Sequence, residues 1–348
     1  MSSYCVGSRR LTAWLISMAL LIPFGLVEYC AVPIPAMAQS SGQKDERPTK
    51  PALKKSPGAQ SDDDGILIKS DLVLLDVAVF DKDNHFVGDL TKENFQVYED
   101  QVLQTIESCT REEAPVSLGF VIDTSGSMRP KLQTVVKAAL YMTKSAKKGD
   151  EFFVVDFKEK AELVEEFTTR VADIQDALDN LIANSGTAML DALAVSTEYA
   201  HKEGKNRRKA VIVMSDGDER DSFYKTKDLI QLMHEYDVQV YIVGFPDELP
   251  DSGGIFRKSQ REKAVELISS LANETGGRAF FPQSLAELDD IARQINTDLR
   301  TQYTLSYTPT NDKADGTYRK ISVKAVDPKR KLIVRTRAGY TAAKEDRR

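Results

Sequence analysis

The sequence has 348 residues, of which 41% are hydrophobic and 29% are charged. This composition suits a globular core beneath a charged surface, and the length suits one large domain or two smaller ones. The formal net charge is −6 and no long basic run occurs, which argues against nucleic acid as a partner.

The first 38 residues are typical of a secretion signal. Arg9 and Arg10 precede a nearly continuous apolar run over 11–27, and Ala36-Met37-Ala38 provides a small-x-small cleavage site. The apolar run is short for a membrane span and is interrupted by a proline and a glycine. We therefore expect a mature, secreted or periplasmic protein that begins at Gln39. An uncleaved membrane anchor is the alternative.

The segments that flank the middle of the chain differ in composition. Residues 39–64 are rich in Ser, Gln, Lys, Pro, Gly and Asp, so they have little to bury and are expected to form a disordered linker. Residues 66–110 and 302–342 are β-rich, and neither segment has a partner for its own apolar face. We expect them to pair as one β-sandwich, with residues 343–348 as a tail. The strands expected here are 72–79, 95–98, 103–106, 303–307, 318–326 and 332–340.

Residues 115–300 alternate apolar runs with segments of helical period. The expected strands are 116–122, 152–157, 211–214, 238–243 and 279–281. The expected helices are 131–143, 171–182, 188–202, 261–274 and 284–299. This alternation predicts an α/β fold with a Rossmann-like, doubly wound and mostly parallel sheet.

Three polar segments accompany these elements. They are Asp123-Thr124-Ser125-Gly126-Ser127-Met128, Ser185-Gly186-Thr187 and Ser215-Asp216-Gly217-Asp218. The first and third directly follow predicted strands, and the second lies in the loop between two predicted helices. Because ligands bind at the carboxyl ends of parallel strands, we expect Asp123, Ser125, Ser127 and Asp216 to converge there.

The residue types in these segments suit a hard divalent cation. Every candidate side chain offers oxygen, and Mg²⁺ prefers an octahedron of oxygens at about 2.1 Å. Two serine hydroxyls, a third hydroxyl from Thr187 and two carboxylates fill much of that shell. They leave room for water or for an incoming carboxylate. Each segment alone reads more simply as turn or helix-cap chemistry, and their combination carries the prediction.

Residues 115–300 resemble the von Willebrand factor A family at these positions. Its metal-ion-dependent adhesion site has the pattern Asp-x-Ser-x-Ser, then Thr, then Asp, and the chain matches it throughout. The matching residues are Asp123, Ser125, Ser127, Thr187 and Asp216. The resemblance implies that the hydroxyls bind Mg²⁺ or Mn²⁺ directly and that the aspartates bind directly or through water. It also implies that a partner's Asp or Glu completes the shell. The flanks resemble secreted bacterial proteins of this family.

Several other residues near these segments have two readings. Asp218, Glu219 and Asp221 form either a solvated acidic loop or a group that tunes the charge of the site. Asp191 either supports the site from behind or lies on a helix surface. The long loop 245–258 follows a predicted strand, so we expect it to take part in recognition.

The residues bear on three candidate functions. An extracytoplasmic, metal-dependent protein-binding module for adhesion or scaffolding is the expected one, with membrane contact only through an uncleaved signal. A Mg²⁺-dependent hydrolase with Asp123 as nucleophile is a less favoured alternative, because a dehalogenase-like phosphatase needs an acid at position 125, which is Ser. A serine hydrolase needs a nearby base, but His85, His201 and His234 lie outside the three segments. We therefore expect no enzyme. A structural protein whose metal only steadies a loop remains the other alternative.

Overall fold

The structure of the chain is a computed structural model, which describes residues 72–344 except 84, 112, 185 and 252–257. The expected signal peptide and linker lie outside these described residues. Within the described part, no helix has the length and hydrophobicity that a membrane crossing requires.

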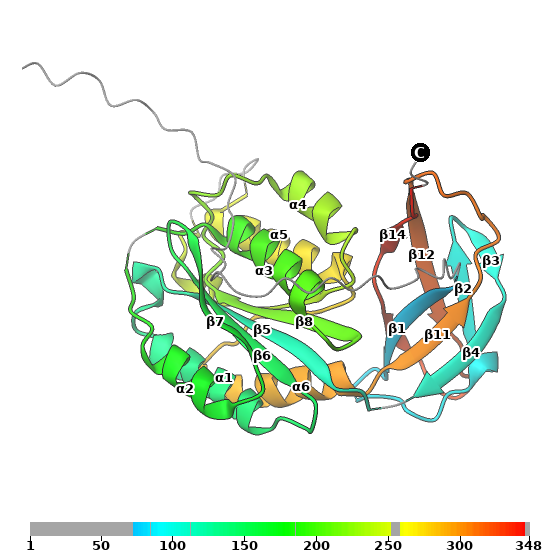
Figure 1. Cartoon of the computed structure of the whole chain (residues 1–348), viewed down its shortest axis with the longest axis horizontal. Coiled ribbons are helices and arrows are strands. Elements are labelled where there is room, and N and C mark those ends of the chain that lie inside the picture. Colours follow the sequence, from blue (N-terminus) through cyan, green and yellow to red (C-terminus); the bar gives the residue numbers. More distant parts are fainter. Residues whose placement is uncertain (1–71, 84, 112, 185, 252–257, 345–348) are drawn as a thin grey trace, which may run out of the picture. The chain divides into compact units, whose positions relative to one another are not determined.

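A six-stranded sheet forms the centre of the α/β part of the chain (Figure 1). Its strands are β5 (Val116–Asp123), β6 (Glu151–Phe157), β7 (Ala161–Thr168), β8 (Arg208–Ser215), β9 (Gln239–Gly244) and β10 (Ala279–Phe280). Their order is β10-β9-β8-β5-β6-β7, and every neighbouring pair is parallel except β6 with β7. Every residue of β5 is buried, as expected for a central strand that is covered on both faces.

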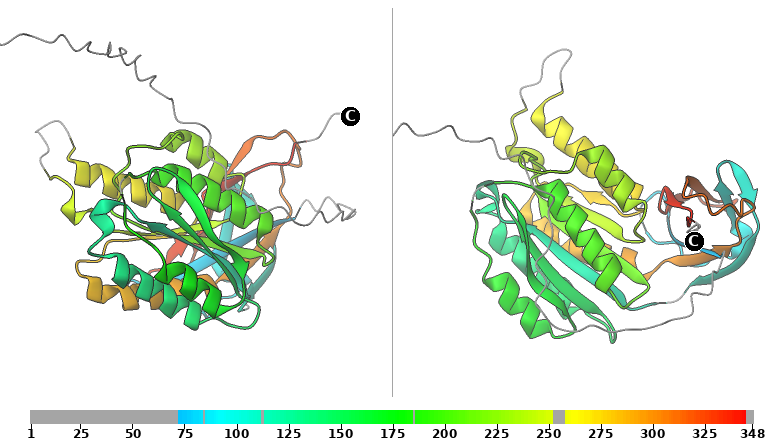
Figure 2. Two further views of the ribbon diagram at one scale, coloured as in Figure 1. Left: turned by 60° about the vertical axis from the view of Figure 1, so that its left-hand side comes forward. Right: turned by 45° about the horizontal axis from the view of Figure 1, so that its top comes forward.

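Helices cover both faces of this sheet (Figures 1 and 2). They are α1 (Leu132–Lys144), α2 (Val171–Asp179), α3 (Met189–Glu203), α4 (Thr226–Met233), α5 (Gln260–Glu274) and α6 (Leu288–Arg300). One core contains Phe120 of β5 together with side chains of α1, α2 and α6. The other contains Val121 with side chains of α3, α4 and α5. Successive residues of β5 thus serve opposite layers.

The two ends of the described chain together form two four-stranded sheets. Their strands are β1 (Val73–Phe80), β2 (Phe95–Glu99), β3 (Val102–Gln104), β4 (Ile106–Arg111), β11 (Tyr303–Tyr307), β12 (Tyr318–Ala325), β13 (Ile333–Arg335) and β14 (Gly339–Thr341). The orders are β13-β1-β11-β4 and β14-β12-β2-β3. In each sheet a strand from one end pairs antiparallel with a strand from the other, as β1 does with β11 and β2 with β12. Both sheets contribute to one apolar core, which includes Leu75, Val97, Leu305 and Ile321.

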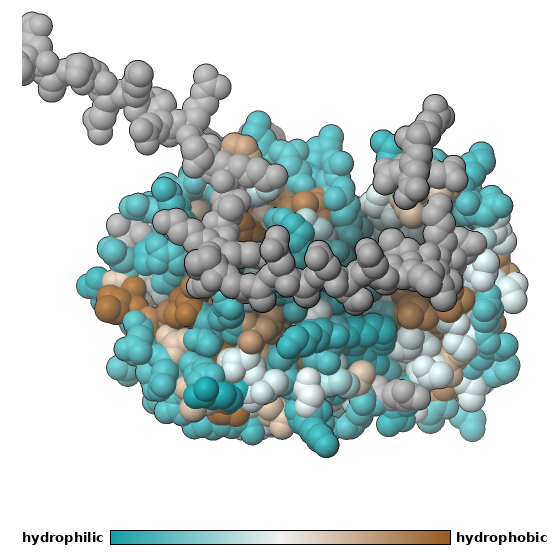
Figure 3. All heavy atoms as spheres, viewed as in Figure 1, coloured by the Kyte–Doolittle hydropathy of each residue, from teal (hydrophilic) through white to brown (hydrophobic). Residues whose placement is uncertain are grey.

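The expected fold class is confirmed, but two expected strands are each divided. The strand expected at 103–106 is observed as β3 and β4, and the strand expected at 332–340 as β13 and β14, with the members of each pair in different sheets. Two further elements were not expected. Strand β7 adds an antiparallel edge strand to the parallel sheet, and helix α4 connects β8 to β9 along the chain. The face in view in Figure 3 is largely hydrophilic, with smaller hydrophobic patches, as expected from the charged fraction of the chain.

The chain enters and leaves the α/β part at the same end of its strands, the end where the parallel strands begin. Strand β4 ends at Arg111 shortly before β5 begins at Val116, and α6 ends at Arg300 shortly before β11 begins at Tyr303. The carboxyl end of β5 lies one strand length away, about 25 Å for eight residues. The loops that follow β5, β8 and β9 therefore project from the carboxyl ends of the strands, opposite these two connections.

Candidate metal centre

Asp123, the last residue of β5, lies beneath the predicted site rather than at its surface. One carboxylate oxygen, Oδ1, accepts a hydrogen bond from the backbone N–H of Ser125 at 2.8 Å, and Oδ2 accepts one from the Ser215 hydroxyl at 2.6 Å. The residue is fully buried. Asp123 thus ties the end of β5 to the end of β8.

Above this carboxylate, three oxygen-bearing side chains form a compact group. The hydroxyl oxygens of Ser125 and Ser127 are 3.1 Å apart, and the Ser127 hydroxyl donates to Oδ2 of Asp216 at 2.5 Å. The chain turns sharply after Asp216, where Gly217 has φ +78° and a Cβ would lie 2.6 Å from Cδ1 of Ile268. Only glycine fits this turn without strain.

Thr187 lies in the loop between α2 and α3, and its backbone is bonded to the loop that follows β8. Its N–H donates to Oδ2 of Asp221 at 2.9 Å. Its carbonyl accepts from the N–H groups of Arg220 and Asp221 at 3.3 and 3.2 Å. The second polar segment is therefore held to the loop that continues from the third.

These loops surround a cleft of about 490 Å³. Its lining residues are Ser125, Gly126, Ser127, Gly186, Thr187, Asp216, Asp218, Arg220, Asp221, Leu249 and Pro250. Four of the five predicted metal residues are among them. The fifth, Asp123, lies behind the lining, in contact with Ser125.

Burial dominates the electrostatics of Asp123. It raises the pKa of this carboxyl to about 6, against the hydrogen bonds from Ser125 and Ser215 that lower it, and the charge of Asp216 raises it further. Burial also raises the pKa of Glu219, although the N–H groups of Leu190 and Ser222 donate to its carboxylate. A bound cation would oppose both effects, because positive charge favours the ionised carboxylate.

The donor set fits a hard cation in kind and in spacing. Neighbouring ligands of an octahedron with bonds of about 2.1 Å lie about 3.0 Å apart, close to the 3.1 Å between the two serine hydroxyls. In the part of the chain that the structure describes, no three His, Cys, Asp or Glu side chains are grouped to hold a metal ion. The predicted site relies on hydroxyls instead, so the assignment of the five residues stays a prediction.

The acidic residues around the cleft support the loop after β8. Both carboxylate oxygens of the buried Asp191 in α3 accept hydrogen bonds at 2.9 Å, from the N–H groups of Phe223 and Tyr224. Asp191 therefore anchors this loop and is no surface residue. Asp218 forms an ion pair with Arg220 at 2.5 Å. The group is a connected network rather than a purely solvated loop.

Some residues of the centre were missed in the sequence analysis. The sequence pattern marks Ser215 only as part of a polar segment, but its hydroxyl donates to Asp123 and accepts from the N–H of Gly217 at 3.0 Å. Its position immediately before Asp216 was the available signal. Arg220 was not singled out either. From the expected recognition loop 245–258, Leu249 and Pro250 line the cleft.

The three histidines lie elsewhere. His85 pairs with Asp81 at 3.4 Å, His201 stacks on Tyr236, and His234 contacts Glu274 at 2.8 Å. Among the described residues that line the cleft there is no histidine. No imidazole base is therefore placed beside the serines.

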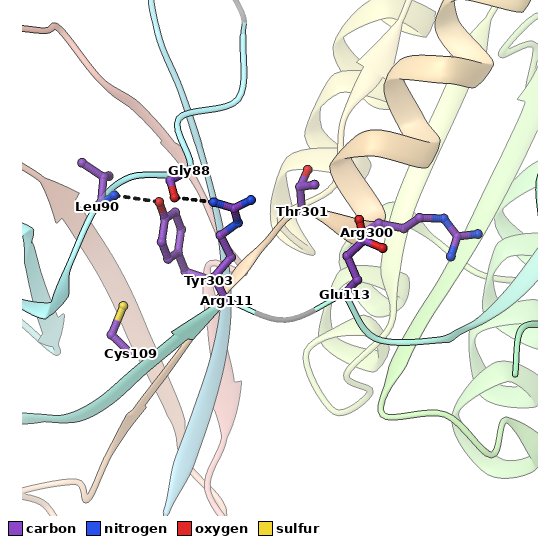
Figure 4. A pocket seen from close by; sticks show the side chains of 8 residues that line it. All are labelled: Gly88, Leu90, Cys109, Arg111, Glu113, Arg300, Thr301 and Tyr303. Carbon is purple, nitrogen blue, oxygen red and sulfur yellow. Dashed lines mark hydrogen bonds between the residues drawn. The ribbon is translucent and has the colours of Figure 1, made fainter. Parts of the chain in front are cut away.

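A second cavity, of about 270 Å³, contains Cys109 and Arg111 (Figure 4). Arg111 donates to the carbonyl of Gly88 at 2.5 Å. The side chain of Arg300 points away from this group in Figure 4 and pairs with the buried Asp150 at 2.6 Å. Cys109 is half-buried, and burial raises the pKa of its thiol. The charged groups here are occupied with structural contacts.

Comparison with known proteins identifies the central part. The sequence profile of the von Willebrand factor type A domain matches residues 118–219. An uncharacterized protein from Synechocystis sp. is 30% identical over 137 residues, which cover 38% of this chain and 33% of that protein. The chain thus spans about a third of the length of this relative.

Three solved structures are similar at low identity. A von Willebrand factor type A protein from Catenulispora acidiphila has a TM-score of 0.45 at 15% identity, with 80% of this chain and 76% of that chain covered. An aerotolerance-related membrane protein from Bacteroides fragilis has a TM-score of 0.41 at 17% identity, covering 53% and 98%. The vWF domain of the type V pili tip protein Mfa5 from Porphyromonas gingivalis has a TM-score of 0.41 at 13% identity, covering 54% and 97%.

Proposed function

We propose that the von Willebrand factor type A domain at residues 118–219 is the centre of a metal-dependent protein-binding module that works outside the cytoplasm. Its cation is Mg²⁺ or Mn²⁺, and its partner presents an Asp or Glu side chain. The observation that carries this proposal is the group of Ser125, Ser127 and Asp216 oxygens, which opens into the 490 Å³ cleft.

The cation would be held mainly by residues of the cleft lining. Ser125, Ser127 and Thr187 supply hydroxyl oxygens, and Asp216 supplies a carboxylate. Asp123 already uses both carboxylate oxygens in hydrogen bonds to protein groups, which favours contact with the cation through water. A shell of four protein oxygens and one such water leaves a position on the open side. A divalent charge there favours an anionic ligand over a neutral one.

Titration calorimetry of the full chain with Mg²⁺ and Mn²⁺ tests the site. We expect one cation per chain, and at least about tenfold weaker binding in Asp123→Ala and Ser127→Ala, because each loses an oxygen that supports the shell. Ser145→Ala, at the end of α1, is the control and should bind normally. Circular dichroism reports whether each variant is folded. Unchanged cation affinity in a folded Asp123→Ala chain would place the site elsewhere.

Partner capture separates recognition from a purely structural role of the metal. The exported protein is used as bait with and without EDTA. Loss of an EDTA-sensitive partner while the circular dichroism spectrum stays native supports recognition. If EDTA instead unfolds the chain, the metal is structural and the proposal fails.

A further inference from the structure

The walls of the cleft differ from one another in chemistry. The lining includes the hydroxyls and Asp216, the cationic Arg220, and the apolar Leu249 and Pro250. Arg220 comes from the loop after β8, whereas Leu249 and Pro250 come from the chain after β9. A ligand that fills the cleft therefore meets a cation site, a guanidinium and an apolar surface together.

Arg220 is fixed at its backbone and exposed at its side chain. Its N–H donates to the Thr187 carbonyl, so its main chain is held beside a predicted metal residue. Its side chain is 68% exposed and its one ion pair shown is to Asp218, through Nη2. This pair engages one nitrogen of a solvent-exposed guanidinium, and the guanidinium has five N–H donors in a planar fork. Arg220 can therefore bind a second carboxylate while it keeps Asp218.

The net charge of the cleft lining determines how Arg220 can contribute to the binding of an acidic ligand. Three aspartates and one arginine line the cleft, so a divalent cation brings the lining to neutrality. A single bound carboxylate then uses the attraction of the cation. A second acidic group would face Asp218 and Asp221 without compensation unless it reached Arg220.

We propose that the cleft recognises a protein segment with two nearby acidic side chains, one on the cation and one on Arg220, and an apolar residue against Leu249 and Pro250. This inference rests on the proposed function and adds the chemistry of the partner. Arginine pairs with carboxylates in bidentate geometry, so Arg220 selects a second acid rather than a second polar group.

Selection from a random peptide library displayed on phage tests this pairing. The full chain is immobilised in Mn²⁺, and peptides are kept only if EDTA releases them. Wild type should enrich peptides with two acidic positions at a constant spacing next to an apolar residue. Arg220→Gln should enrich peptides in which only one acidic position, the one expected to bind the cation, is constant. Arg129→Gln, which changes an exposed arginine on the loop after β5 that lies outside the cleft lining, is the matched control and should select as wild type does.

The enriched peptide then gives a quantitative check by fluorescence anisotropy. Replacement of its second acid by the amide should lower affinity about tenfold in wild type, the size of one charge-assisted hydrogen bond, and should have no effect in Arg220→Gln. EDTA-sensitive peptides with a single acid, indifferent to Arg220→Gln, would overturn this inference and leave the proposed function standing. Absence of any EDTA-sensitive peptide would overturn both.

Discussion

Asp123 and Ser215 illustrate how far individual residues can be predicted. Asp123 was found from the sequence because it follows an apolar run and begins a spaced pattern of oxygen-bearing residues. Its burial was not predicted, because that depends on the Ser215 hydroxyl arriving from a different strand at 2.6 Å. Arg220 escaped notice for a similar reason. Its place at the cleft is set by a hydrogen bond to Thr187, 33 positions away along the printed sequence.

The buried carboxyl of Asp298 in α6 gives a prediction for pH. Burial raises its pKa to about 6 from 3.8, although Arg335 and Arg278 lower it. The folded chain therefore holds this proton more tightly than the unfolded chain, so the group stabilises the fold below about pH 4. That contribution is lost as pH rises to about 6. The unfolding free energy of wild type relative to Asp298→Asn should fall by about 2–3 kcal/mol between pH 4 and pH 7.

Urea denaturation at several pH values, in EDTA, measures this difference. Asp289→Asn, at an exposed position in the first turn of the same helix, is the control and should show no such trend. A difference between wild type and Asp298→Asn that stays constant or grows with pH would contradict the assignment.

At the scale of elements, long periodic segments were predictable and short or irregular ones were not. The helix expected at 188–202 is observed as α3 at Met189–Glu203. Helix α4 has only eight residues, too few to establish a period. Strand β7 alternates exposed and half-buried positions, with register shifts in its pairing to β6, and its glutamates resemble a surface loop. Such acidic side chains suit a sheet edge, since they oppose pairing with another chain.

Asp191 of α3 provides two of the hydrogen bonds that hold the loop between β8 and α4. Asp191 accepts the N–H groups of Phe223 and Tyr224, and Asp191→Ala would leave both without this partner. We expect hydrogen exchange across 217–225 to accelerate at least about tenfold, since each lost bond to a charged group is worth about 1.5–3 kcal/mol. Cation affinity should fall as well, because this loop begins at Asp216.

Hydrogen-exchange mass spectrometry of the folded chain provides the measurement. Asp228→Ala removes an exposed carboxylate from the first turn of α4 and should leave the exchange pattern unchanged. Native protection of 217–225 in Asp191→Ala would show that the loop has other, sufficient anchors.

For the molecule as a whole, the pairing of its two ends was predictable and the register was not. Each flank has an apolar face that it cannot cover alone, which was sufficient to expect one shared core. The alignment of Val73 with Tyr307 and of Val97 with Val323 depends on matching two segments that lie far apart in the sequence. Local patterns of period two do not define that match.

This shared core makes each flank dependent on the other. A chain ending at Thr301 lacks β11 to β14, so β1 loses both of its partners, β2 keeps only β3, and Leu75 and Val97 lose part of their covering. We expect such a chain to aggregate, because a large apolar surface becomes exposed. Size-exclusion chromatography and circular dichroism check this against a chain lacking only 345–348. A monomeric, fully folded chain ending at Thr301 would refute it.

The pairing of β1 with β11 also has a mechanical consequence. If the cleft captures a partner as proposed, a pull on that partner would leave the α/β part through both of its connections, one of which runs from α6 into β11 at Tyr303, while an opposing pull through the chain before β1 would enter at Val73. These two residues lie at opposite ends of the ladder, which runs from Val73 opposite Tyr307 to Val77 opposite Tyr303. The two strands are then loaded in shear, so the hydrogen bonds between them share the force and do not break one after another.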